Sequence, residues 1–251
     1  MGKADLHIHS SYSHDSTNTV SAILEWTANA TDLDVIAITD HDQINGALEA
    51  RERAGQYGLT VIPGIEITTT QGHLLALFVE RPVPAGLSFY ETVLRVGEQG
   101  GIAIAAHPYG FLAHGVTGET VHAVLQDPDA ARVLIGMEAI NTGLFIQKSN
   151  QRASRLAVEM QLAAVGSSDS HLFWTIGYGY TEFPGTGAED LRRALLARQT
   201  SACQLTHRHS PAYFLSHIFY YTLRRFGWVT WASEPNADLV LRRLADVQAR
   251  A

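Results

Sequence analysis

This chain of 251 residues has a single cysteine and fewer basic than acidic residues. A single cysteine, Cys203, excludes an internal disulfide framework and indicates a reducing compartment such as the cytoplasm. The net charge of -7 argues against a broad basic surface, so we expect no stable complex with nucleic acid. No apolar run approaches the roughly 18 residues that a membrane span needs. No secretory signal is visible either, because Asp5, His7 and His9 interrupt the place of its apolar core.

What the chain does contain is an ordinary globular composition with one unusual feature. Apolar residues make up 46% and charged residues 17%, which suits one large folded domain with a modest appendage. The unusual feature is the histidine count of 12. Because histidine is the commonest metal ligand among side chains, the positions of these residues deserve close inspection.

Short apolar runs alternate with helix-like segments. The runs that predict strands are almost continuously apolar, as in a parallel sheet buried on both faces; they cover 5–9, 34–40, 60–67, 73–79, 101–108, 134–140 and 162–168. Predicted helices cover 20–30, 45–57, 89–98, 119–125, 147–161 and 189–197. The short link between the third and fourth strands could be a hairpin. This order predicts an α/β fold, most simply a closed or nearly closed TIM-like barrel of about seven strands. A doubly wound open sheet is the alternative, although no G-x-G-x-x-G follows the first strand.

The composition changes after about Gln204. We therefore predict a barrel domain over residues 1–203 and a C-terminal helical extension over 204–251 that packs on the barrel. The extension is rich in aromatic residues and arginine, and its simplest role is a helix that seals one end of the domain. A contact between two copies in a homo-oligomer, or docking to a membrane surface, is the alternative role.

Residue types that bind metals fall at the carboxyl ends of the predicted strands, the face on which α/β barrels build active sites. They are His7 and His9 on the first strand, Asp40, His41 and Asp42 on the second, Glu66 on the third, His107 on the fifth, Glu138 within the sixth, and Asp169 and His171 on the seventh. His73 opens the fourth strand, which is the same end if that strand runs antiparallel. One histidine or aspartate alone is more often structural or a helix cap. The joint pattern instead predicts two or three divalent ions, and ligands without thiolate suit zinc, manganese or iron.

The segments DLHIHS, AITDHD, IPGIE, GHLLAL, IAAHP and SSDSH occur in the order and spacing of the PHP (polymerase and histidinol phosphatase) family. The chain resembles this family from about Asp5 to Phe183. The resemblance implies a distorted (β/α)7 barrel with up to three metal ions and, usually, phosphoesterase activity. Carried over position by position, it implies ligands for the first ion (His7, His9, Glu66 and Asp169), the second (Glu66, His73 and His107) and the third (Asp15, His41 and His171).

The loop after the first strand departs from the common family pattern. Many members have SDG where this chain has SHDS. We align Asp15 with the acidic ligand, since a related DS form of the motif also occurs in the family. His14 stays an alternative, because either residue could reach a third ion from this loop.

Such a cluster would hydrolyse a phosphate ester through a metal-activated hydroxide, without a serine or cysteine nucleophile. Asp40 and Asp42 are candidates to orient the metal-binding imidazoles through hydrogen bonds, although Asp42 could equally cap the following helix. Asn141 and Arg152 are candidate substrate contacts. Arg152 could equally belong to the polar face of a helix.

The acidic pI favours a small phosphorylated metabolite or a short nucleotide over a long nucleic acid. Two other readings remain open. One is an amidohydrolase-type hydrolysis of C–N bonds, which also uses H-x-H on a first barrel strand and an aspartate on the last. The other is a non-catalytic module that keeps the fold.

Overall fold

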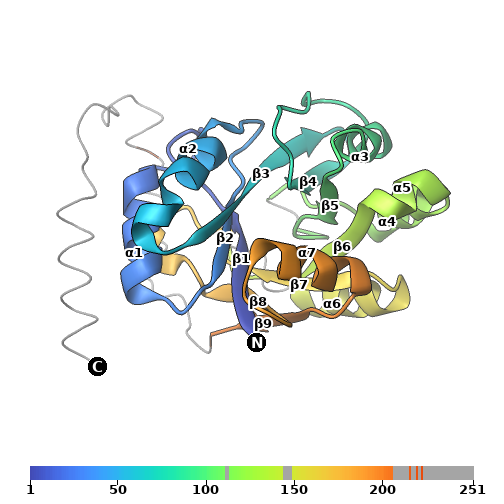
Figure 1. Ribbon diagram of the computed structural model, residues 1–251. Helices are drawn as coiled ribbons and strands as arrows, with labels where there is room; N and C mark the ends of the chain where they lie inside the picture. Colours follow the sequence, from blue (N-terminus) through green and yellow to red (C-terminus); the bar gives the residue numbers. More distant parts are fainter. Residues whose placement is uncertain (111–112, 144–148, 206–214, 216–218, 220–221, 223–251) are drawn as a thin grey trace.

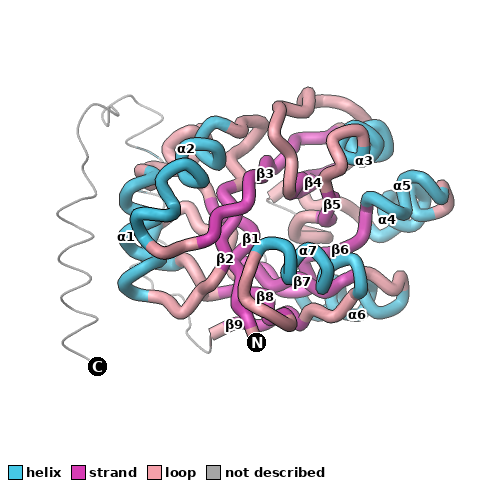
Figure 2. The backbone as a smooth tube through the Cα atoms, in the orientation of Figure 1, coloured by secondary structure: helices cyan, strands magenta, loops and turns pink. Residues whose placement is uncertain are grey.

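Nine strands form one continuous sheet in the computed structural model, which describes residues 1–110, 113–143, 149–205, 215, 219 and 222. The strands are β1 (Gly2–Ile8), β2 (Val35–Ile38), β3 (Thr60–Thr69), β4 (Gly72–Leu77), β5 (Ile102–Ala105), β6 (Leu134–Asn141), β7 (Ala163–Ser167), β8 (Gly179–Phe183) and β9 (Ser201–Gln204). Their order across the sheet is β7-β6-β5-β4-β3-β2-β1-β8-β9. Figure 2 shows the helices lying outside the strands.

Helices connect most successive strands (Figure 1). They are α1 (Val20–Ala30), α2 (Asn45–Arg53), α3 (Phe89–Gly97), α4 (Gly118–Leu125), α5 (Pro128–Val133), α6 (Asn150–Glu159) and α7 (Ala188–Ala197), with short 3-10 turns η1 (Ala54–Tyr57) and η2 (Phe173–Thr175). Several begin at side-chain caps that the sequence supplies. The hydroxyl of Thr19 accepts a hydrogen bond from the backbone N–H of Ala22 at the start of α1, and Ser88 and Glu91 form a capping box on α3.

The sheet curls until its ends nearly meet. β1 to β3 are parallel, β4 is antiparallel to both β3 and β5, and β5 to β7 are parallel again. Beyond β7, Ser170 forms a parallel bridge to Ile8 of β1. Its carbonyl accepts from the N–H of His9 at 2.9 Å, and its own N–H donates to the carbonyl of His7 at 3.2 Å. The predicted α/β fold with a nearly closed barrel is confirmed.

The structure differs from the sequence prediction in several elements. The hairpin between β8 and β9, which extends the sheet beyond β1, was not predicted, and neither was α5. The helix predicted over 45–57 ends at Arg53 and continues as a 3-10 turn to Tyr57. The helix predicted over 147–161 is α6, and residues 144–148 lie outside the described part. The hairpin between β3 and β4 is confirmed. Most of the predicted extension over 204–251 lies outside the described residues, so its boundary stays a prediction.

Two clusters of buried apolar side chains hold the barrel together. The larger one packs the strands against α1 to α6, and the smaller one joins the early residues of most strands to Leu191, Ala194 and Leu195 of α7. Because those residues begin the parallel strands, α7 covers the end of the barrel opposite to the predicted ligands. Burial of this apolar surface is the main force that stabilises the fold.

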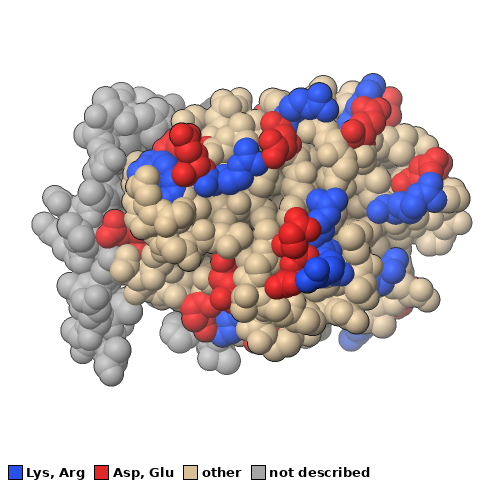
Figure 3. Space-filling model, in the orientation of Figure 1, with Lys and Arg blue, Asp and Glu red and all other residues tan. Residues whose placement is uncertain are grey.

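The described surface carries charges of both signs. Figure 3 shows lysine and arginine side chains next to aspartate and glutamate over one face of the molecule. Arg51 pairs with Glu80 at 2.6 Å, and Arg53 with Glu49 at 2.6 Å. Among the described residues, no helix combines the length and the apolar character that crossing a bilayer requires.

Candidate metal centre

The nine side chains predicted as ligands form one continuous cluster at the carboxyl ends of the strands. Each has a nitrogen or oxygen atom within 3.5 Å of an atom of another member; they are His7, His9, Asp15, His41, Glu66, His73, His107, Asp169 and His171. Side chains separated by more than 150 residues, such as Asp15 and His171, meet here because β1 and β7 adjoin at the barrel seam.

Two histidine nitrogens of this cluster have coordination-shell spacing from each other and from two carboxylate oxygens. Nε2 of His7 and His9, Oε2 of Glu66 and Oδ1 of Asp169 lie 3.1–3.5 Å apart in the five pairs measured. Ligands at about 2.0–2.1 Å from a tetrahedral ion lie about 3.3 Å from one another. These four side chains are almost fully buried, and they match the ligand set that the family resemblance implies for the first ion.

A break in side-chain alternation aims His7, in β1, and His9, the residue that follows β1. Ala4 and Leu6 pack in the smaller core cluster, whereas Ile8 packs in the larger one, although a regular strand would put all three on one face. The pairing of β1 with β2 is irregular between Asp5 and Ile8. His7 and His9 therefore share a face, as their spacing predicts, and the irregularity turns that face toward the cluster.

Glu66 lies at the middle of the cluster and uses its two oxygens separately. Oε2 faces the first group, while Oε1 lies 2.9 Å from Nδ1 of His73 and 2.8 Å from Nε2 of His107. The antiparallel register of β3 and β4 pairs His73 with Thr68, which places His73 near Glu66 on the same face. The carboxylate is thus positioned to bridge two ions.

The third group lies nearer to the surface. Oδ2 of Asp15 is 3.0 Å from Nε2 of His171 and 3.3 Å from Nε2 of His41. His14 is exposed, and its ring centre lies 5.0 Å from that of His41. The contacts of Asp15 favour its carboxylate as the ligand of a third ion, and the choice between Asp15 and His14 stays a prediction.

The buried nitrogens of this cluster fit bound cations better than internal hydrogen bonds. Nδ1 of His41 and Nδ1 of His73 have no hydrogen-bond partner in the described structure, although they lie 3.2 Å and 2.9 Å from oxygens of Glu66. Two atoms this close without hydrogen-bond geometry are typical of ligands that converge on a third atom. The side chains form four overlapping groups of histidine and carboxylate residues, and within each group the candidate ligand atoms lie within 4.8 Å of one another. The residues present fit divalent metal ions.

The charges in the cluster reinforce this interpretation. Burial acts to raise the pKa of Glu66, but the surrounding histidines outweigh it and hold that pKa well below its usual range. The same balance holds the pKa of Asp169 well below its usual range. Burial lowers the pKa of His9 to about 3, so its ring is neutral and keeps a lone pair for a metal. The carboxylates outweigh burial at His41 and His171 and raise the pKa of each to about 9.

Asp40 and Asp42 hold the backbone around the cluster rather than its imidazoles. Both oxygens of Asp40 accept hydrogen bonds from Ser10, one from the N–H at 2.5 Å and one from the hydroxyl at 2.6 Å. Oδ1 of Asp42 accepts from the N–H of Thr68 at 2.8 Å, and α2 has no side-chain cap. Asp42 therefore ties the loop after β2 to β3, and neither imidazole orientation nor helix capping describes its contacts.

The two predicted substrate contacts differ in exposure. Asn141 is fully buried, and its amide donates to Glu138 at 2.9 Å and to Asp169 at 3.3 Å, so its contacts are with the cluster. Arg152 is exposed at the start of α6, with its guanidinium stacked 3.5 Å above the ring of Tyr109. Arg152 thus lies on the predicted helix and over Tyr109, which follows the predicted ligand His107 by two residues.

Glu138 lies at the centre of a buried network, a role the sequence analysis did not assign to it. Its Oε1 accepts from Nδ1 of His7 at 2.9 Å and from the hydroxyl of Ser167 at 2.6 Å. Its Oε2 accepts from the N–H of His107 at 2.6 Å and from Nδ2 of Asn141 at 2.9 Å. The signal available in the sequence was a glutamate inside an otherwise apolar strand, which must be hydrogen-bonded there.

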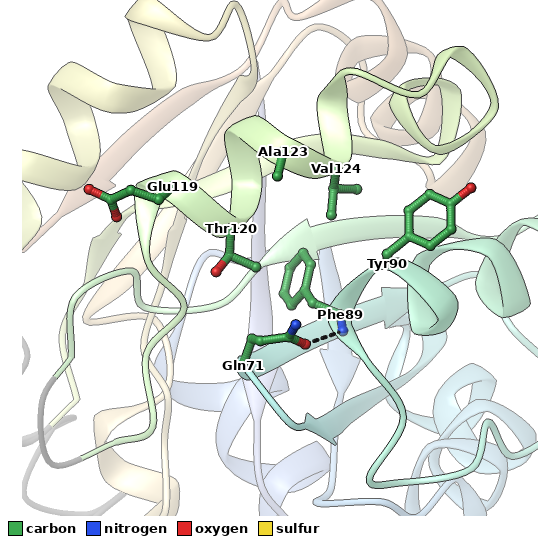
Figure 4. A pocket seen from close by; sticks show the side chains of 7 residues that line it. All are labelled: Gln71, Phe89, Tyr90, Glu119, Thr120, Ala123 and Val124. Carbon is green, nitrogen blue, oxygen red and sulfur yellow. Dashed lines mark hydrogen bonds between the residues drawn. The ribbon is translucent and has the colours of Figure 1, made fainter.

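A separate hollow of about 500 Å³ lies between the turn after β3, α3 and α4 (Figure 4). Phe89 and Val124 are its buried residues, and the amide oxygen of Gln71 accepts from the N–H of Phe89 at 2.7 Å. None of the nine clustered side chains lines it. It is distinct from the candidate metal centre.

Comparison with known proteins identifies the family of this chain. The PHP domain model matches residues 5–141, and the PHP-associated model matches residues 147–200. An uncharacterized protein of Methanocaldococcus jannaschii, MJ1587, is 42% identical over 117 residues, which are 43% of this chain and 68% of that protein. A phosphoribosyl 1,2-cyclic phosphate 1,2-diphosphodiesterase of Eggerthella lenta is 36% identical over 87 residues, 32% of each chain.

Among solved structures, the chain is similar to a two-domain protein of Bacteroides vulgatus that contains a predicted PHP-like metal-dependent phosphoesterase. The TM-score is 0.66 at 21% identity, over 87% of this chain and 69% of that one, and this likeness concerns the fold. The PHP domain model covers more than half of the sequence and contains seven of the nine clustered side chains. The chain belongs to the PHP domain family.

Proposed function

We propose that this protein is a metal-dependent phosphoesterase that hydrolyses a small phosphorylated metabolite, a nucleotide or a short oligonucleotide. The observation that carries the proposal is the position of Glu66. Its two oxygens face two different sets of histidines at 2.8–3.3 Å, as a carboxylate that bridges neighbouring divalent ions does. Two neighbouring ions are the arrangement with which many phosphatases and nucleases stabilise the attacking and leaving oxygens.

The side chains suit two or three ions of manganese, zinc or iron. The groups defined above would hold them: His7, His9, Glu66 and Asp169 the first; Glu66, His73 and His107 the second; Asp15, His41 and His171 the third. Such ions, when bound, supply a water of lowered pKa and positive charge for the phosphoryl oxygens. The protein contributes largely buried imidazole and carboxylate side chains, and the carboxylates of Glu66 and Asp169 are ionised there.

Two further facts support a phosphate substrate of modest size. The relative in Eggerthella lenta is named as a phosphodiesterase, and its 36% identity over 87 residues is evidence of common descent. The net charge of -7 disfavours a long polyanion away from the metal centre. Arg152 is the cation that we propose to contact the phosphate or another anionic group of the substrate.

The test is product release after the full chain is stripped with a chelator and reloaded with Mn²⁺. The panel holds an aryl phosphate monoester, an aryl phosphate diester, histidinol phosphate, a nucleoside 3′,5′-bisphosphate and a short 5′-phosphorylated RNA. We expect manganese-dependent turnover of at least one member and none in the stripped protein. The preferred member then separates a monoesterase from a diesterase.

Turnover of no member, by a protein shown to bind metal, would contradict the proposal. Amide and ring substrates would then test the hydrolysis of C–N bonds, and failure there too would favour a non-catalytic module.

We also propose a cytoplasmic location, on the grounds of the lone cysteine, and a homo-oligomer through residues 204–251.

A further inference from the structure

Two polar residues of β6 point into the same buried network although they are three positions apart. In a regular strand, residues at i and i+3 face opposite sides of the sheet. β6 pairs irregularly with β7, since Glu138 lies opposite Val165 while Ile140 lies opposite the next residue, Gly166. The extra residue of β6 is a bulge, and it brings Glu138 and Asn141 to one face.

Glu138 touches ligands of two different ions. Because a carboxylate only accepts, Nδ1 of His7 is the donor in its 2.9 Å bond to Glu138 Oε1, which leaves Nε2 as the atom free to bind a metal. The other oxygen receives the N–H of His107 at 2.6 Å. The backbone of His107 is held there at a φ of 25°, a conformation that costs energy outside glycine.

Asn141 continues the network to a third ligand. Its Nδ2 donates to Glu138 at 2.9 Å and to Oδ2 of Asp169 at 3.3 Å, so Oδ1 of Asp169 is the oxygen that faces His7. Its Oδ1 accepts from the N–H of Gly143 at 2.8 Å. Every polar atom of this side chain is used, which fixes the orientation of the amide.

We infer that Glu138 and Asn141 are positioning residues that set the affinity of the first two metal ions, while the third ion is independent of them. The inference rests on the proposed function, because it concerns the ions that the phosphoesterase would use. In the third group, Asp15 and His41 share no hydrogen bond with Glu138 or Asn141 in the described structure. His171 lies 3.7 Å from Oδ1 of Asp169, so its link to Asn141 runs through that residue. Residues that orient metal ligands typically change affinity by about 10–100-fold when they are replaced.

The test is a titration of the metal-free full chain with Mn²⁺, in which free Mn²⁺ is followed by electron paramagnetic resonance. Glu138→Gln keeps the shape of the side chain but replaces one carboxylate oxygen with an amide N–H₂ group. That group cannot accept the two hydrogen bonds that the oxygen accepts in the wild type. We expect its affinity for two ions to fall about 10–100-fold and its affinity for one ion to stay within about twofold of wild type. Asn141→Ser, which loses the two amide donors, should weaken mainly the ion of Asp169, by about tenfold.

A matched control is Thr181→Val, because Thr181 is also fully buried. Its hydroxyl accepts from the N–H of Gly166 at 3.0 Å and donates to the carbonyl of Gly166 at 2.9 Å, away from every predicted ligand. The melting temperature of each metal-free variant reports its structural loss. If Glu138→Gln fails to fold, the comparison of Asn141→Ser with Thr181→Val carries the test.

The inference would be overturned if the Mn²⁺ affinity of Glu138→Gln and Asn141→Ser fell no further than that of Thr181→Val. An equal loss of affinity for all ions would also overturn it. Activity is not the readout, which separates this inference from the proposed function. A wild-type chain that binds Mn²⁺ but hydrolyses no panel member would contradict the proposed function alone. A wild-type chain that binds no divalent ion would overturn both.

Discussion

Oδ2 of Asp15 lies 3.0 Å from Nε2 of His171, although 156 residues separate the two along the chain. The contact joins the loop after β1 to the loop after β7, and His41 completes the group. The sequence left Asp15 and His14 as alternative ligands, and the contacts of Asp15 with His41 and His171 favour Asp15.

Asp15→Asn should remove one metal ion. The substitution keeps the size of the side chain but removes the charge that His41 and His171 face, and a lost ligand should cost at least about 100-fold in affinity. Elemental analysis after dialysis against a weak chelator measures the metal content. His14→Ala is the matched control and should keep the wild-type content; a loss in His14→Ala with none in Asp15→Asn would reverse the assignment.

Glu66→Gln should affect two ions at once, because each oxygen of Glu66 faces a different set of histidines. We expect the metal content to fall by about two ions per chain, together with the stabilisation that bound ions give the folded state, about 2.7 kcal/mol for an ion at 100 times its dissociation constant. Thermal unfolding with and without Mn²⁺ measures this. Glu80→Gln, which changes a surface partner of Arg51, is the control; a Glu66→Gln protein that Mn²⁺ stabilises like wild type would refute the bridging role.

Asp5→Asn should destabilise the barrel at its seam. The fully buried carboxylate accepts from the N–H groups of Ser168 at 3.0 Å and Gly177 at 2.8 Å, whereas an asparagine offers one oxygen only. Leaving a buried N–H unpaired costs about 1–3 kcal/mol, which denaturant unfolding resolves. Asp32→Asn removes an exposed partner of Lys3 and should cost no more than about 1 kcal/mol; equal losses in the two variants would contradict the seam role.

Cys203 should react slowly with thiol reagents. Partial burial, and then the negative charge of Glu182, raise the pKa of its thiol above the usual value, so less thiolate is present at any given pH. The rate of reaction with a disulfide reagent, measured from pH 7 to 10, should have its midpoint above that of a cysteine peptide. Glu182→Gln should lower that midpoint. A midpoint at or below the peptide value would show that the thiol is not shielded.

The strands that the sequence revealed are those that packing makes uniformly apolar. β1 to β7 are buried almost throughout, and their sequences are correspondingly rich in apolar residues. β8 alternates buried and half-buried residues, and β9 is short and largely exposed, so neither stands out from a loop. The helix α5 has 6 residues, too few for a periodic pattern.

The site shows a similar division. The residue types at strand ends indicated a metal cluster, because His7, Glu66 and Asp169 have few other uses in a buried position. The supporting contacts depend on geometry that no spacing reports. Asn141 reaches the network only through the bulge in β6, and Asp42 finds the N–H of Thr68 only because its φ is 54°.

The seam of the barrel has a consequence for how the chain acquires its site. β1 and the loop after it contribute His7, His9 and Asp15, and the loop after β7 contributes Asp169 and His171. The first and third groups therefore each need both ends of the described barrel. During synthesis, the first group cannot assemble until Asp169 has left the ribosome, and the third group cannot assemble until His171 has. An ion held by both ends would also link them across the barrel, and because it binds the folded arrangement it would oppose opening of the seam.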